Sequence, residues 1–291
     1  MTTPLVILGC GYIGARLART ALALGRPVRV GARSTGRLAP LGALGAEIKY
    51  LDAAMPKQLG PALQSMRGGT LVYSIPPIAS LPPREAVRKT LQAAAGAGIA
   101  RYIHLSSSGL YGEAPDDDTW IDDETPVDLT DQPMQGVLTD EDAVETSTFA
   151  LPTTTILRLA PVYGPGRGVR ARLRKGDYRL LDDGQHAISR VHVDDVAQII
   201  LAVEERAVHR SRYLVADDEP TTQLDYATWL CERMGLPLPP FRATFAPGKA
   251  KVAHRNRRVR NTRLKADLGI TLRYPTFREG EAAIEAEEAA G

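Results

Sequence analysis

The stretch Leu5-Val6-Ile7-Leu8-Gly9-Cys10-Gly11-Tyr12-Ile13-Gly14 decides the fold class of this chain. Four apolar residues in a row are typical of a buried parallel strand, and the G-x-G-x-x-G that follows stands where a helical pattern begins. In such a loop the first glycine permits a tight turn, the second lets backbone approach a pyrophosphate, and the third allows close helix packing. A glycine-rich turn without a ligand is the alternative. The context of strand and helix favours a dinucleotide-binding loop.

Strand-like apolar runs alternate with helical patterns along the first half of the chain. The expected strands cover residues 5–8, 28–30, 46–51, 70–75, 101–105 and 153–159. This alternation predicts an α/β fold with a Rossmann-type doubly wound parallel sheet, which collects its ligands at the carboxyl ends of the strands.

The second half is less regular, with proline and glycine clusters. It shows helical patterns at 193–205 and 224–234 and a short strand at 212–215. We expect residues 1–160 to form the dinucleotide-binding domain and residues 161–291 to form a smaller C-terminal substrate lobe, with segments that return to the sheet.

Composition excludes several classes of protein. Hydrophobic residues make up 44% and charged residues 24%, so the chain is not disordered as a whole. The formal net charge of +2 gives no reason to expect a nucleic-acid or membrane partner. Two cysteines cannot form a disulfide framework, and no export signal or membrane-spanning run is seen. We expect a cytoplasmic monomer or homodimer that binds a small molecule and no metal.

The end of the second expected strand points to the kind of dinucleotide. An NAD site usually has an acid about 20 residues beyond the loop, which binds the ribose 2′-hydroxyl. Here Arg33 and Ser34 end the strand, Arg37 follows, and no acid occurs until Glu47. A guanidinium suits a 2′-phosphate because it forms paired, charge-assisted hydrogen bonds, which predicts NADP(H). The alternative is that both arginines are simply solvated.

Further residues complete the expected cofactor site. Asp52 follows the third strand, where it would either bind the adenine amine or cap a helix. The residues expected to contact the cofactor are Gly9, Gly11, Tyr12, Ile13, Gly14, Arg33, Ser34, Arg37, Asp52, Ser74, Pro76 and Ser106. Cys10, inside the loop, is expected to be a small buried filler and not a nucleophile.

Several segments in the right order resemble the extended short-chain dehydrogenase/reductase superfamily. Residues 101–112 (RYIHLSSSGLYG) are similar to its fifth strand and active-site serine segment, and residues 158–167 (RLAPVYGPGR) to the segment that usually faces the nicotinamide. Residues 191–197 (VHVDDVA) are similar to the stretch that returns to the sheet. The tail at 261–264 and 272–280 resembles an atypical subgroup, whose members carry the name NAD-dependent epimerase/dehydratase.

The chain departs from this superfamily at its general acid/base. The resemblance implies a Tyr-x-x-x-Lys pair on the helix after the fifth strand, with the tyrosine near residues 135–137, and a serine at Ser107. No tyrosine lies between Tyr111 and Tyr163, and no lysine between Lys89 and Lys175. Residues 113–145 instead carry thirteen acids and no lysine or arginine. The usual pair is therefore absent.

Two functions remain open after this departure. One is an NADP-dependent oxidoreductase or epimerase-like enzyme that acts on a small carbonyl or anionic substrate with another proton donor. Its catalytic candidates are Ser107, Tyr111 and Tyr163, although a packing role is the alternative for both tyrosines. The other is a non-catalytic NADP(H)-binding sensor or scaffold.

The histidines and two basic clusters each allow a functional and a structural interpretation. His186 and His192 could do acid/base work, but a core histidine is the preferred interpretation of His192. The histidines and cysteines show no metal-ligand spacing. Basic clusters at 167–179 and 249–265 would either bind an anionic substrate or pair with the acidic segment 113–145, within the chain or across a dimer.

Overall fold

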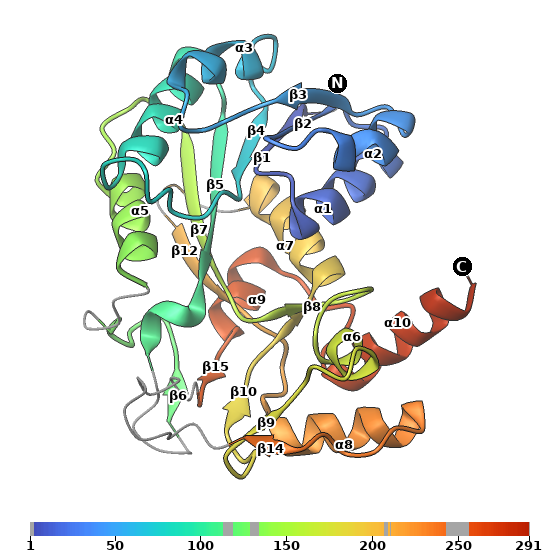
Figure 1. Cartoon of the computed structure of the whole chain (residues 1–291). Helices are drawn as coiled ribbons and strands as arrows, with labels where there is room; N and C mark the ends of the chain where they lie inside the picture. The colour runs from blue at the N-terminus through green and yellow to red at the C-terminus, as the bar shows by residue number, and fades with distance from the viewer. Residues whose placement is uncertain are drawn as a thin grey trace.

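Seven parallel strands form the central sheet, in the order β12-β7-β5-β4-β1-β2-β3 (Figure 1). The computed structural model describes residues 3–112, 119–128, 134–206, 209, 211–242 and 256–290. The strands are β1 (Leu5–Leu8), β2 (Val28–Ala32), β3 (Glu47–Tyr50), β4 (Thr70–Tyr73), β5 (Arg101–Ser107), β7 (Thr153–Leu159) and β12 (Ser211–Val215). The strand order reverses between β1 and β4, which is the point where a doubly wound sheet opens a crevice for a ligand.

Helices cover both faces of the sheet, as parallel strands require. Leu5 and Ile7 of β1 belong to the core under one layer, whereas Val6 and Leu8 belong to the core under the other. The first layer holds α1 (Tyr12–Ala23), α2 (Ala39–Ala43), α7 (Val193–Arg206) and α9 (Thr262–Leu268). The second holds α3 (Leu59–Leu63), α4 (Glu85–Gly96) and α5 (Gln135–Glu145). The α/β doubly wound sheet expected from the sequence is confirmed.

The structure places two of the expected segments in detail. The strand expected at 212–215 joins the main sheet as β12, where it pairs in parallel with β7. It does so because β7 is buried along almost its whole length and needs a neighbour on its outer side. The helix α5 forms within the acidic stretch, where only a narrow side with Ala143 and Val144 packs into the core.

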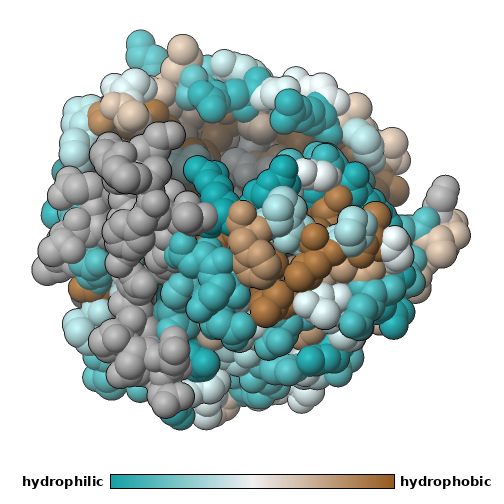
Figure 2. Space-filling view, turned by 60° about the horizontal axis from the view of Figure 1, so that its bottom comes forward, coloured by the Kyte–Doolittle hydropathy of each residue, from teal (hydrophilic) through white to brown (hydrophobic). Residues whose placement is uncertain are grey.

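A second lobe lies below the carboxyl ends of the strands. Its core contains Leu180, Tyr226, Leu230, Phe277 and Ile284. Its helices are α6 (Val169–Arg174), α8 (Gln223–Met234) and α10 (Phe277–Ala290). Its strand pairs are β9 (Leu180–Leu181) with β14 (Phe241–Arg242) and β10 (Ala187–Ile188) with β13 (Thr221–Thr222). Figure 2 shows this end of the molecule as largely hydrophilic, with hydrophobic residues gathered near its centre.

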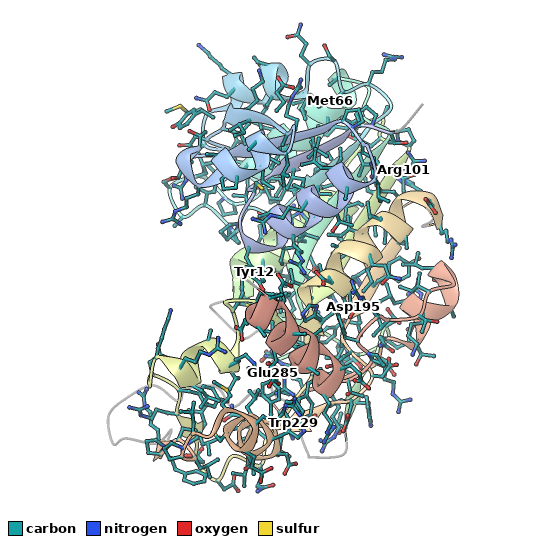
Figure 3. All side chains as sticks on the ribbon, turned by 90° about the vertical axis from the view of Figure 1, so that its right-hand side faces the viewer. Tyr12, Met66, Arg101, Asp195, Trp229 and Glu285 are labelled. Atoms are coloured by element: carbon teal, nitrogen blue, oxygen red, sulfur yellow. The ribbon has the colours of Figure 1, made fainter. Side chains whose placement is uncertain are left out.

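Two more strand pairs, β8 (Val162–Tyr163) with β11 (Val191–His192) and β6 (Trp120–Ile121) with β15 (Arg258–Val259), complete the structure. In Figure 3, Tyr12 lies between the sheet and the second lobe, far from Met66 and Arg101 at the opposite end of the sheet. No helix in the described ranges is long and apolar enough to cross a membrane.

The helix α10 ties the lobe to the sheet layers through its acidic side chains. Each of four glutamates pairs with an arginine from another helix. The pairs are Glu281 with Arg170, Glu285 with Arg233, Glu287 with Arg16, and Glu288 with Arg174. Arg16 lies on α1, directly beyond the glycine-rich loop, and also pairs with Asp194 at the start of α7.

Candidate active site

Each glycine of the loop meets a different constraint. Gly9 has a φ of +83°, and a Cβ there would lie 2.6 Å from the Ser74 carbonyl oxygen. A Cβ at Gly14 would lie 2.9 Å from Cγ2 of Ile7, so α1 packs directly on β1. At Gly11 the nearest atom to a Cβ would be 3.8 Å away, which leaves its surface open to a ligand.

The amino end of α1 can receive phosphate groups. Gly11 is its N-cap, no side chain caps it, and its first turn contains no acid. The unpaired N–H groups and the partial positive charge of this helix end therefore suit a pyrophosphate. Cys10 is buried beside them, and burial raises the pKa of its thiol to about 12, so the thiol stays protonated as a filler.

The expected 2′-phosphate residues lie at the end of β2. Arg33, Ser34 and Arg37 are exposed, and in the part of the chain that is described neither arginine forms an ion pair or a side-chain hydrogen bond. Asp52 accepts a hydrogen bond from the Ala54 N–H at 3.0 Å, a turn-capping contact that leaves its other oxygen available. Ser74 follows β4 beside the glycine-rich loop, where its N–H donates to the Leu8 carbonyl oxygen, and Pro76 is exposed two residues further along.

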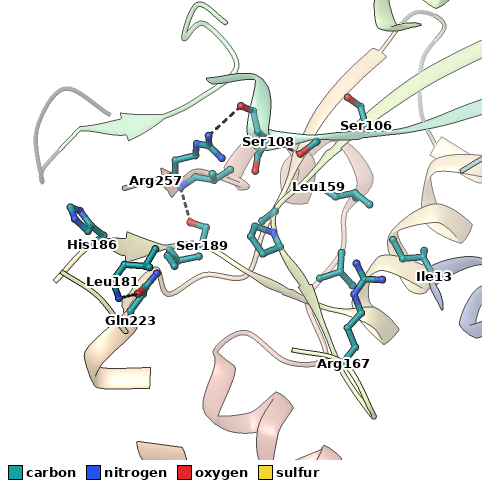
Figure 4. A pocket seen from close by; sticks show the side chains of 17 residues that line it. Ile13, Ser106, Ser108, Leu159, Arg167, Leu181, His186, Ser189, Gln223 and Arg257 are labelled. Atoms are coloured by element: carbon teal, nitrogen blue, oxygen red, sulfur yellow. Dashed lines mark hydrogen bonds between the residues drawn. The ribbon is translucent and has the colours of Figure 1, made fainter. Parts of the chain in front are cut away.

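A cavity of about 440 Å³ lies at the carboxyl ends of β5 and β7. Its wall brings together the glycine-rich loop, both strands and the second lobe (Figure 4). Polar side chains in the wall are Ser106, Ser107, Ser108, Arg167, His186, Ser189, Gln223 and Arg257. Ile13 contributes from α1, and Leu159 to Val162 contribute from the segment after β7.

The serines at the end of β5 have distinct hydrogen bonds. Ser107 Oγ accepts from the Gly109 N–H at 2.9 Å, which caps the short turn Ser108–Tyr111. Ser106 Oγ donates to Oε1 of Glu141 at 2.5 Å. Ser107 therefore retains a hydroxyl proton that it can donate to a ligand in the cavity, whereas the proton of Ser106 is already engaged.

A buried charged network stands behind these serines. The Arg158 guanidinium binds both carboxylate oxygens of Glu141, with Nη2 at 2.6 Å from Oε2 and Nε at 3.0 Å from Oε1. The remaining Nη1 donates to the Tyr111 hydroxyl at 2.6 Å. Arg158 is 3% exposed and Glu141 is 1% exposed, so the pair is shielded from solvent. Glu141 lies on α5, within the stretch where the superfamily has its lysine.

Neither candidate tyrosine lines the cavity. Tyr111 is buried against Arg158, and burial raises the pKa of its phenol although the guanidinium partly offsets the rise. Tyr163 is buried beneath α10, with its hydroxyl so close to Gly280 that a Cβ there would lie 2.0 Å from the oxygen. Burial raises the pKa of Tyr163 as well. Of the three catalytic candidates, the structure brings only Ser107 to the cavity wall.

The other groups singled out in the sequence are placed as follows. His186 lines the cavity. His192 is buried between Tyr163 and Tyr274, and burial lowers the pKa of its imidazole to about 4, so it is a neutral core histidine. No group of three metal-ligating side chains occurs within the described ranges.

The basic cluster at 167–179 pairs with acids other than the expected ones. Arg170 and Arg174 bind Glu281 and Glu288 of α10, and Arg172 binds Asp177. In the second cluster, residues 249–255 lie outside the described residues, whereas Arg263 lies 3.5 Å from Asp123 of the acidic segment and Lys265 lies 2.9 Å from Asp218.

Sequence reasoning missed Glu141 and Arg158 as members of the site. One signal was present, because Arg158 stands inside the apolar run Ile156-Leu157-Arg158-Leu159. A charge within a buried strand requires a buried partner of opposite sign. The sequence did not show which of the thirteen acids that partner would be, because this depends on the rotation of α5 against the sheet.

Known proteins are similar to this chain over nearly its whole length. The NAD(P)H-binding family model matches residues 9–206. Protein YeeZ of Escherichia coli (strain K12) is 27% identical over 92% of this chain and 95% of its own length. A conserved protein of unknown function from Silicibacter pomeroyi DSS is 30% identical, with a TM-score of 0.82, over 98% of this chain and 99% of that one.

A third relative carries a more specific name. A protein from Methylobacillus flagellatus that is an NAD-dependent epimerase/dehydratase by name only is 28% identical, with a TM-score of 0.76, over 99% of this chain and all of that one. The resemblance drawn from the sequence is confirmed. The chain belongs to the NAD(P)H-binding family and is a member of the extended short-chain dehydrogenase/reductase superfamily.

Proposed function

We propose that this protein is an NADP(H)-dependent oxidoreductase or epimerase-like enzyme that acts on a small carbonyl or anionic substrate. The cavity at the ends of β5 and β7 carries this proposal. Its wall contains Ile13 from the dinucleotide loop and Ser107 from β5, so a molecule bound there lies next to the cofactor site. Its volume of about 440 Å³ suits a small substrate.

The choice of NADP(H) rests on Arg33 and Arg37. Both are exposed at the end of β2, next to the loop, and neither is engaged with an acid in the described structure. Two available guanidinium groups at this position favour a 2′-phosphate, whereas an NAD site would offer an acid for the ribose hydroxyl.

Hydride transfer is the chemistry that the bound dinucleotide supplies. Among the residues of this chain, Ser107 is placed to bind the substrate oxygen, because its hydroxyl proton is available. Ser106 and the network behind it hold the end of β5 in position. Tyr111 and Tyr163 remain candidates for the proton donor, but either would need to reach the substrate from outside the present wall.

A non-catalytic NADP(H)-binding sensor or scaffold is the second candidate. It is favoured by the composition of the cavity wall, which contains no tyrosine or lysine within the described residues. The place of the usual lysine is taken by Glu141, whose charge is already compensated by Arg158. Such a site would still bind the cofactor.

Calorimetry tests the cofactor assignment. We expect the wild-type protein to bind NADPH more tightly than NADH. Replacing Arg33 and Arg37 by alanine should remove a preference of roughly ten- to a hundredfold, which corresponds to about 1.5–3 kcal/mol for a paired phosphate contact. Arg88→Ala, an exposed arginine on α4, is the control. Equal affinities for the two cofactors in the wild-type protein would reject NADP(H).

Turnover separates the two candidate functions. The consumption of NADPH would be followed with a panel of aldehydes, ketones and 2-oxo acids. Turnover that is lost in Ser107→Ala supports the enzyme. Tight NADPH binding without turnover of any compound favours the sensor.

A further inference from the structure

Arg167 lies on the second lobe, next to the amino end of α1. It belongs to the hairpin between β8 and α6, where the N–H groups of Gly164 and Arg167 bind each other's carbonyl oxygens at 3.2 and 3.0 Å. Its guanidinium carbon lies 5.0 Å from the centre of the Tyr12 ring. Since Tyr12 is the first residue of α1, this stack brings a cation from the lobe to the helix end that faces the phosphates.

The contact between the hairpin and the loop is closely fitted. The Tyr12 hydroxyl donates to the Pro165 carbonyl oxygen at 3.1 Å. A Cβ at Gly164 would lie 2.5 Å from the same hydroxyl, so only glycine allows the hairpin to approach this closely. Tyr12 therefore holds the hairpin, and with it Arg167, at a defined place beside the loop.

Arg167 differs from the other arginines of its cluster in having, among the described residues, neither an acid nor a carbonyl group bound to its side chain. Arg179, by contrast, is held by the carbonyl groups of Gly176 and Tyr178. Arg170, Arg172 and Arg174 each pair with a carboxylate. Arg167 is exposed and forms no ion pair or side-chain hydrogen bond with any residue in the described ranges. A positioned guanidinium without a counter-ion is suited to bind an anion that arrives with a ligand.

The anion that fits this place is the pyrophosphate of the dinucleotide. Arg167 and Ile13 lie together in the cavity wall, towards the end occupied by the loop, whereas His186 and Arg257 lie towards the other end (Figure 4). Arg257 is itself held by the carbonyl groups of Gly109 and Gly112. Among these arginines, Arg167 is thus the one beside the phosphate-binding helix end.

We propose that Arg167 is a cofactor-binding residue, whose guanidinium, held on the Tyr12 ring, binds the pyrophosphate of NADP(H) from the second lobe. This inference rests on the proposed cofactor. It implies that both lobes hold the dinucleotide, so that the bound cofactor joins the hairpin of the lobe to α1 of the sheet layer.

Calorimetry with two probes tests the inference. NADPH contains the pyrophosphate, whereas adenosine 2′-monophosphate carries the 2′-phosphate alone. Arg167→Met keeps an apolar stem against Tyr12 and removes the charge. We expect it to weaken NADPH binding about tenfold or more and to leave adenosine 2′-monophosphate binding within about twofold of wild type. Arg33→Ala should weaken both.

Arg172→Met is the matched control, because Arg172 is also an exposed arginine stacked 5.0 Å from a tyrosine ring, that of Tyr178, but lies outside the cavity wall. It should bind both probes as wild type does. Unchanged NADPH affinity in Arg167→Met, or an equal loss for both probes, would overturn the role of Arg167 while the cofactor assignment stands. A wild-type protein that binds neither NADPH nor NADH would reject the proposed function, and this inference with it.

Discussion

Arg158 on β7 and Glu141 on α5 form a two-armed ion pair that is almost completely enclosed by protein, with their closest atoms 2.6 Å apart. Glu141 lies on the helix on which the resemblance implies a tyrosine and a lysine, whereas Arg158 lies on a strand of the sheet. It joins the helix to the strand, and through Ser106 and Tyr111 it reaches two segments next to the cavity. The pair therefore positions the wall of the cavity from behind and is not itself exposed in it.

Removing either charge of the Arg158–Glu141 pair should strongly destabilise the folded protein. Glu141→Gln or Arg158→Met leaves a buried charge without compensation, which typically costs about 3–5 kcal/mol. Urea unfolding would measure the loss of free energy. Arg212→Ala, which removes the exposed partner of Glu145, is the control and should cost no more than about 1 kcal/mol. A loss in Glu141→Gln no larger than that of the control would contradict the structure.

Two glycines of the loop should respond differently to valine. Gly11→Val places its side chain in open space, so we expect an unchanged fold and no NADPH binding, because the methyl groups occupy the approach of the pyrophosphate. Gly14→Val forces atoms against Ile7 and should destabilise the fold by about 1–3 kcal/mol. Thermal unfolding and calorimetry distinguish the two effects. Wild-type affinity in Gly11→Val would show that the loop does not hold the phosphates.

Tyr111→Phe separates a structural role from a catalytic one. Loss of the hydroxyl leaves Nη1 of buried Arg158 without its acceptor, which should cost about 1–3 kcal/mol of stability. A proton-donor role would in addition lower turnover about a hundredfold or more at unchanged NADPH affinity. Tyr50→Phe, at an exposed position, is the control. A folded Tyr111→Phe protein with wild-type turnover would remove Tyr111 from the chemistry and leave Ser107 and Tyr163.

The stability of the protein should depend on pH through Asp140. Burial raises the pKa of this carboxyl on α5 to about 6. Above pH 6 the Asp140 carboxyl is ionised in both the folded and the unfolded protein, but its charge is less favourable in the buried site than in water. This difference lowers the free energy of unfolding by up to about 3 kcal/mol. Below the unfolded pKa of about 4 the carboxyl is protonated in both states and the cost disappears.

Asp140→Asn should therefore stabilise the protein above pH 6, and the gain should vanish towards pH 4. The difference between the urea midpoints of variant and wild type at the two pH values measures this effect. Asp142→Asn on the same helix, next to Arg84, is the control and should show no such gain. A gain of equal size at both pH values would mean that ionisation of Asp140 is not its cause.

The sheet and the cofactor loop could be predicted because their signals are local. The apolar run Leu5–Leu8 and the glycines that follow it act within one strand and one turn, and the same holds for each strand expected in the first half. The place of β12 beside β7 could not be read in this way, because it depends on which edge of the sheet is left open.

The cavity was harder to predict because its wall comes from distant parts of the chain. Ser106, His186 and Arg257 meet only after the lobe has folded onto the sheet. The lobe itself contains strands of two residues, which are too short to produce a pattern in the sequence. The sequence allowed the same two interpretations for every arginine of the basic cluster that contains Arg167, namely anion binding or pairing with acids. Only the structure shows that Arg170 and Arg174 pair with α10 and that Arg167, within the described ranges, does not.

The attachment of α10 to α1 affects the order in which parts of the chain can fold during synthesis. Arg16 and Glu287 are separated by 271 residues, so a ribosome adds the second partner on the order of 10–60 s after the first. Phe277 and Ile284, which belong to the core of the lobe, arrive equally late. The sheet strands can pair on the emerging chain, but the lobe core and the ion pair that braces α1 are completed only after α10 has been synthesised.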